Sequence, residues 1–105
     1  MNILFDQGTP VPLRAALVGH PVETAYERHW STLSNGDLLS VAETASFDVF
    51  VTTDQNLPNE QNLSGRRIAV IVLPTTRWQQ IQQHAADVVA AVESIRPGEY
   101  RALNW

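Results

Sequence analysis

The sequence contains no cysteine and no lysine, and these two absences exclude several kinds of chemistry. Without cysteine the chain cannot form disulfides, thiolate zinc sites or iron–sulfur clusters, and it has no thiol nucleophile. Without lysine it cannot form a Schiff base, hold phosphate with a P-loop lysine or work as a lysine-dependent phospho-receiver. All 7 basic residues are arginines.

Long apolar segments and an excess of positive charge are also missing. Residues 1–6 carry no basic group and too few apolar side chains for a signal peptide, and no segment approaches the ~18 apolar residues of a membrane helix. With 7 basic and 11 acidic residues the net charge is −4, so any contact with nucleic acid must be local. We expect a cytoplasmic protein with no membrane partner.

The residues that are present are typical of one globular domain. A chain of 105 residues, 44% of them hydrophobic, can bury a single core but is too short for two. No repeat, low-complexity stretch or change of composition marks an internal boundary. We therefore predict a single domain over residues 1–105.

Apolar runs alternate with helical patterns along the chain. Thr9 is a candidate N-cap for a helix with Pro10 at its first position, and a long helix is expected between Pro74 and Pro97. Another helix is expected over 38–45, and 55–65 is predicted to be a polar loop. The predicted strands cover residues 2–6, 22–26, 48–53, 68–73 and 100–103.

This alternation predicts an α/β fold, a three-layer α/β/α sandwich around a mostly parallel five-stranded sheet. Such sheets bind ligands beyond the carboxyl ends of their strands, where the strand order reverses. In the commonest five-strand order the first and third strands lie side by side at that point. Asp6 and Asp54 end these two strands.

Two carboxylates about 4 Å apart repel by roughly 4 kcal/mol, so a shared proton, an arginine or a cation must offset the repulsion. Oxygen ligands without nearby histidine or cysteine favour Mg²⁺ or Mn²⁺, which commonly activates water in phosphodiester hydrolysis. Turn or cap roles for Asp6 and Asp54 are equally open. Asp37 fits a capping box with Ser34, and on spacing alone we favour this role over a ligand role.

The chain resembles a family of small bacterial PIN-like domains, which are similar to VapC-type toxin ribonucleases. The motifs that carry the resemblance extend over most of the chain and are Asn2–Pro10, Gly19-His20, Leu33–Leu39 and Val51–Leu57. The resemblance implies an acidic Mg²⁺ or Mn²⁺ site at the strand ends that cuts RNA, and pairing with a small antitoxin protein. Asp6 and Asp54 match the family's strand-end acids, and Asp37 lies on the helix that carries a further acid.

Three positions depart from the family pattern. Similar chains commonly carry acids where this one has Gln7, Asn35 and Asn56. Amides keep an oxygen ligand but lose its charge, so each replacement weakens the attraction for a divalent ion. The remaining acids could support one metal ion, and the number of ions and the activity itself stay open.

Two functional hypotheses follow. In the first, Asp6, Asp37 and Asp54 are the catalytic metal ligands of a ribonuclease, while Thr53 and Asn56 position ligands or RNA. In the second, the depleted acid set leaves a module that binds RNA or a partner protein without cutting. Self-association into a homo-oligomer is open in both.

Few other residues offer a functional signal. Arg66 and Arg67 could contact phosphate or form a solvated pair entering a strand. Trp30 could stack on bases, whereas Trp78 fits the core stripe of its helix. His20 is expected to make local hydrogen bonds in a turn.

Overall fold

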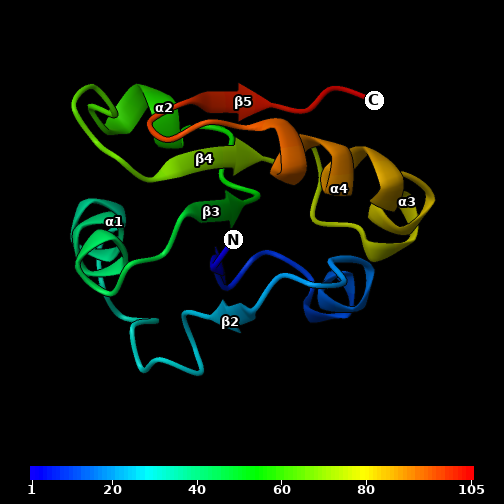
Figure 1. Ribbon diagram of the computed structural model, residues 1–105, viewed down its shortest axis with the longest axis horizontal. Coiled ribbons are helices and arrows are strands. Elements are labelled where there is room, and N and C mark those ends of the chain that lie inside the picture. Colours follow the sequence, from blue (N-terminus) through cyan, green and yellow to red (C-terminus); the bar gives the residue numbers. More distant parts are fainter.

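The computed structural model covers residues 1–105 and describes all of them apart from the side chain of Glu60. Its strands are β1 (Ile3–Phe5), β2 (Val22–Thr24), β3 (Val49–Thr52), β4 (Ala69–Val72) and β5 (Tyr100–Ala102). Its helices are η1 (Val11–Ala16), α1 (Asn35–Thr44), α2 (Leu57–Glu60), α3 (Trp78–Gln83) and α4 (Ala85–Ser94). The strands form one five-stranded sheet in the order β2-β1-β3-β4-β5 (Figure 1).

Every pair of neighbouring strands in this sheet is parallel. The three central strands, β1, β3 and β4, are buried along their whole lengths. Parallel strands covered on both faces have near-continuous apolar sequences, which is why these segments could be recognised in the sequence. The predicted α/β class with a parallel five-stranded sheet is confirmed.

Helices cover both faces of the sheet, because alternate strand residues point in opposite directions. Phe5 and Val51 face the side on which η1, α3 and α4 pack. Leu4 and Phe50 face the other side, where α1 and α2 pack. Figure 1 shows α1 on one side of the sheet and α3 and α4 on the other. The predicted three layers are therefore present.

The strand order reverses direction between β1 and β3. β1 pairs with β2 on one side and with β3 on the other, so the chain extends the sheet first one way and then the other. Phe5 is level with Val51 in this pairing. The predicted adjacency of the first and third strands is confirmed, and it brings together the residues that follow them.

The segment after Pro10 is a 3-10 helix, η1, whose first bond runs from Leu13 N–H to the carbonyl of Pro10 at 3.1 Å. Pro10 and Pro12 are tolerated here, because the first amide groups of a helix have no acceptor within it. The N-cap is Pro10, so the prediction of Thr9 as the N-cap is wrong. The Thr9 hydroxyl instead contacts Asp6 and Val51.

Two further helical predictions differ from the structure. The long helix is divided into α3 and α4 at His84, which has a non-helical backbone. The predicted polar loop contains the short helix α2, anchored by the buried side chain of Leu57.

Within the described part of the chain, no helix combines the length and the apolar character needed to cross a bilayer.

Candidate functional site at the strand ends

The candidate site lies where β1 and β3 end next to each other. Asp6 directly follows β1, and its backbone N–H donates to the carbonyl of Val51 at 3.2 Å. Asp54 lies two residues beyond Thr52, the last residue of β3. The parallel pairing therefore brings the two acidic segments to the same edge of the sheet, as the sequence predicted.

The hydroxyl of Thr52 connects these two acidic segments. It donates to Oδ2 of Asp6 and accepts a hydrogen bond from the backbone N–H of Asp54 at 3.0 Å. Thr52 is completely buried, so water does not compete for either bond. One hydroxyl thus holds the Asp6 carboxylate beside the start of the Asp54 turn.

The second oxygen of Asp6 is held by the loop that follows it. Oδ1 accepts from the backbone N–H of Thr9 at 3.0 Å and lies 2.7 Å from the Thr9 hydroxyl. That hydroxyl also lies 2.9 Å from the carbonyl of Val51, so its single proton serves one of two acceptors. Thr9 is 2% exposed, which makes it a buried support of the site.

Asp54 is oriented by two different elements. Its Oδ2 accepts from Nδ2 of Asn35, the first residue of α1, at 3.0 Å. Its Oδ1 accepts from the backbone N–H of Asn56 at 2.9 Å. Together with the bonds of Thr52, these contacts link four residues, which we call the strand-end site: Asp6, Asn35, Thr52 and Asp54.

The predicted substrate residue Thr53 lies against the loop after β1. A Cβ added to Gly8 would collide with the Thr53 hydroxyl, so only glycine allows this close approach. Asn56, the other predicted substrate residue, supports Asp54 through its backbone N–H. Both residues therefore adjoin the strand-end site.

Asp37 is not part of the strand-end site. Its side chain is exposed on α1, and its backbone N–H donates to Oγ of the N-cap residue Ser34 at 3.3 Å. This bond is one half of the predicted capping box. Among the described residues, no three of histidine, cysteine, aspartate or glutamate lie close enough to hold a metal ion. The structure thus places Asp6 and Asp54 at the adjoining strand ends and Asp37 on the exposed surface of α1, while a role of Asp37 as a metal ligand stays a prediction.

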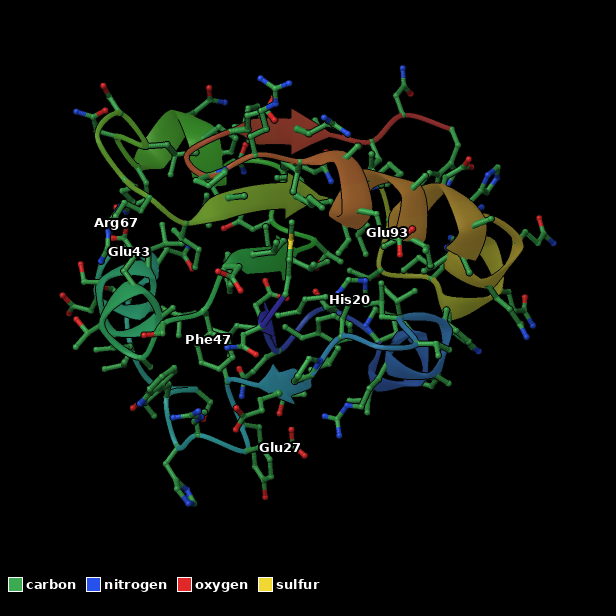
Figure 2. All side chains as sticks on the ribbon, viewed as in Figure 1. His20, Glu27, Glu43, Phe47, Arg67 and Glu93 are labelled. Carbon is green, nitrogen blue, oxygen red and sulfur yellow. The ribbon has the colours of Figure 1, made fainter. Side chains whose placement is uncertain are left out.

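Arg66 and Arg67 lie before β4, at the amino end of the strands. The Arg66 guanidinium donates to Glu43 at 2.7 Å, and its Nη2 lies 3.4 Å from the carbonyl of Gly36. The backbone N–H of Arg67 donates to the same Glu43 carboxylate at 2.7 Å, and Figure 2 shows Glu43 and Arg67 together at α1. The structure does not bring this arginine pair to Asp6.

Two hollows border Asp6. The smaller, of about 220 Å³, is lined by Gln7, Trp30 and Asn35 among others. The larger, of about 560 Å³, lies between η1 and the turn after β2 and is lined by Arg14 and Tyr26 among others. Tyr26 is 74% exposed at this hollow. Sequence analysis did not single out Tyr26, because an aromatic residue within a predicted strand is expected to pack.

The arginine and glutamate beside the larger hollow form an ion pair. Nη2 of Arg14 lies 2.7 Å from Oε1 of Glu27, and this bond is the main cause that lowers the pKa of Glu27 below its ordinary value. Glu27 Oε1 also accepts from the backbone N–H of Thr24 at 2.9 Å. The pair fixes the turn that carries Tyr26.

The remaining aromatic and histidine candidates make contacts with other parts of the fold. Trp78 packs against the core, as predicted. Trp30 meets Phe47 edge-on, with ring centroids 6.1 Å apart, and the Arg28 guanidinium lies over its ring. His20 was predicted to make local hydrogen bonds, but its ring lies between two groups distant in the sequence, the Met1 amine at 3.1 Å and Glu93 at 3.4 Å (Figure 2).

Comparison of the chain with protein-family models, with curated proteins and with solved structures gives no match. The functional argument therefore depends on the residues and on their geometry. What that geometry provides is a pair of carboxylates, fixed by hydroxyl and amide groups, at the switch point of a parallel sheet beside two hollows.

Proposed function

We propose that this chain is a metal-dependent ribonuclease of the PIN-like kind, the toxin of a toxin–antitoxin pair, acting on cytoplasmic RNA. The observation that carries the proposal is the placement of Asp6 and Asp54 at the adjoining carboxyl ends of β1 and β3. Ligands of open α/β sheets bind at this position, where the strand order reverses.

The donors of the strand-end site fit one Mg²⁺ or Mn²⁺ ion. Mg²⁺ is usually held by one or two carboxylates, keeps several waters and takes further ligands from substrate phosphates. Asp6 and Asp54 supply two carboxylates, and Asn35 contributes an amide beside them. When bound, the ion would activate a water and neutralise charge on the phosphate.

The protein's own groups position the two carboxylates. Thr52 and Thr9 restrain both oxygens of Asp6, while Asn35 and the Asn56 amide restrain both oxygens of Asp54. Oδ2 of Asp6 and both oxygens of Asp54 each accept one hydrogen bond and keep a lone pair for a cation, whereas both Thr9 donors contact Oδ1 of Asp6. Pre-organised ligands lose little freedom when they bind, which favours binding.

The larger hollow beside Asp6 would take the RNA. The exposed Tyr26 ring offers a face on which a base can stack, a contact worth about 1–3 kcal/mol per base. The Arg14 guanidinium lines the same hollow, where it is paired with Glu27, so an RNA phosphate would compete with that carboxylate for it. Stacking does not depend on positive charge, which agrees with a chain whose net charge is −4.

The test is cleavage of single-stranded RNA with and without Mg²⁺ or Mn²⁺, together with thermal unfolding under the same conditions. We expect the ion to raise the melting temperature and to support cleavage, and Asp6→Asn or Asp54→Asn to abolish both effects. Asp87→Asn, an exposed carboxylate variant on α4, is the matched control and should cleave normally. Full cleavage by Asp54→Asn would refute the proposal.

The variant Asp37→Asn distinguishes a metal site with two acidic ligands from a metal site with three. With Asp6 and Asp54 as the only acidic ligands, the variant should keep metal binding and most of its cleavage rate. Loss of cleavage together with loss of metal-dependent stabilisation would instead assign Asp37 as a third ligand, brought in when the ion binds. A short gene with an antitoxin-like product immediately upstream would support the toxin assignment.

A second function, binding without cleavage, is favoured by one observation. The described residues hold no group of three histidine, cysteine, aspartate or glutamate residues that could bind a metal ion, and amides stand at Gln7, Asn35 and Asn56, where the resemblance to PIN-like chains implies acids. A module of this kind would bind RNA or a partner protein at the same hollow. It would shift RNA in a gel without a divalent ion, and Asp6→Asn would leave that binding intact.

A further inference from the structure

β5 is an edge strand whose outer side is open. It is the last strand of the sheet, and Figure 1 shows no strand beyond it. The carbonyl of Glu99 and the N–H of Leu103 bond to β4, at 2.9 Å each. Because bonding directions alternate along a strand, Tyr100 and Ala102 direct their backbone groups outward, where they have no partner among the described residues.

The side chains along this edge carry opposite charges on one face. Glu99 and Arg101, two residues apart, lie with Oε1 and Nη2 4.0 Å from each other. Both are partly exposed, at 43% and 36% of their side-chain surfaces. Nη1 of Arg101 donates to Ser94 at 2.7 Å, which places this charged face on the α4 side. Tyr100 points to the other face and is 44% exposed.

We propose that two copies of this chain associate by antiparallel pairing of their β5 strands, about a twofold axis at Tyr100. In this register the two Tyr100 residues exchange backbone hydrogen bonds. Glu99 of each copy then lies directly opposite Arg101 of the other copy. The surface is complementary to itself, as a twofold interface requires.

Charge selects this register over the neighbouring one. A twofold axis at Arg101 would set two guanidinium groups directly opposite each other, and like charges at that position destabilise a strand pair. With the axis at Tyr100, each arginine lies between two carboxylates. The pairs formed by Glu99 and Arg101 also occupy the non-hydrogen-bonded positions, where Cα atoms are closest, at about 4.5 Å.

The same geometry predicts a weak association. β5 has three residues, and edge pairing of such length buries little area compared with stable interfaces. We therefore expect a concentration-dependent dimer that joins two sheets into a continuous ten-stranded one. The strand-end site lies between β1 and β3, away from this edge, so the proposal is independent of the proposed function.

The test is sedimentation of the full chain over roughly 10 μM to 1 mM, a range suited to weak association. The wild-type chain should shift from monomer towards twice the monomer mass. Glu99→Arg alone and Arg101→Glu alone should each weaken the dimer at least about tenfold, because two attractive pairs become repulsive. An equimolar mixture of the two variants should dimerise again, since their charges are then complementary across the interface.

Two further variants separate strand pairing from general effects of charge. Arg77→Glu changes the net charge as Arg101→Glu does, but at an exposed position before α3, and should dimerise like the wild type. Ala102→Pro removes an outward N–H and leaves the charges unchanged, and should weaken the dimer. A monomeric wild type, or a mixture that stays monomeric while each variant is folded by circular dichroism, overturns the proposal.

Discussion

At the scale of single residues, the site depends on hydroxyl groups as much as on carboxylates. Thr52 is fully buried and serves as donor to Asp6 and as acceptor from the Asp54 backbone. A buried group that loses its partner costs more than the lost bond is worth, because its desolvation is no longer compensated. The hydroxyl therefore contributes both to stability and to the geometry of the acids.

Replacing Thr52 provides a direct check. We expect Thr52→Val to lower the free energy of unfolding by about 1–3 kcal/mol, because one carboxylate oxygen and one amide lose their buried partner. Thr52→Ser keeps the hydroxyl and should cost less, mainly the packing of one methyl group. Urea denaturation of both variants measures the difference. Equal stability of Thr52→Val and Thr52→Ser would contradict this role.

The sequence allowed the positions of Asp6 and Asp54 to be predicted, but not the residues that hold their carboxylates in place. Each acid follows an apolar run, and the commonest strand order makes their strands neighbours. Thr9 and Thr52 gave no comparable signal, because threonine is common at caps and in strands. Their roles depend on which buried oxygen lies opposite each hydroxyl, and this is decided only by the tertiary packing.

At the scale of elements, Glu43 connects α1 to the start of β4 through hydrogen bonds. Its carboxylate accepts from the backbone N–H groups of Arg67, at 2.7 Å, and Ile68, at 3.3 Å, and from the Arg66 guanidinium. Burial alone would raise the pKa of Glu43, but these hydrogen bonds outweigh it and hold the pKa below the ordinary value of 4.5. The ionised form is thus stabilised by folding.

The consequence is a defined dependence of stability on pH. A carboxylate whose pKa is lower in the folded state stabilises the protein above its unfolded pKa and loses that effect as pH falls through the folded pKa. We expect Glu43→Gln to be less stable than the wild type at pH 7. The difference should narrow as pH falls below 4.5, the ordinary value. Thermal unfolding between neutral and acidic pH measures it, and a constant difference would contradict the mechanism.

The buried central strands were predicted more accurately than the helices. The central strands agree to within one residue at each end, because each is a run of buried and mostly apolar side chains. The helix α2 was missed because it has four residues in a polar segment. The break at His84 was missed because the apolar spacing continues from Ile81 to Val88 across it.

At the scale of the whole molecule, the layered core predicts which strands are best protected from amide hydrogen exchange. β1, β3 and β4 have a strand on each side and helices on both faces, whereas β2 and β5 each have one strand neighbour. We expect the slowest amide hydrogen exchange in β1, β3 and β4, and exchange at least about tenfold faster in β5. Native-state exchange measured by NMR tests this order. Equal protection of β5 and β3 in dilute solution would contradict it.

The all-parallel sheet also has a consequence for how the chain acquires its structure. No two neighbouring strands are joined by a tight hairpin, since each parallel pairing requires a crossover through intervening residues. Of the five strands β1 comes first along the chain; its partner β2 begins at Val22, but its other partner β3 begins only at Val49, more than forty residues after β1. The edge of β1 that faces β3 therefore pairs only with residues distant in the sequence, and because such non-local pairings are slow to form, folding should be slow for a chain of this size.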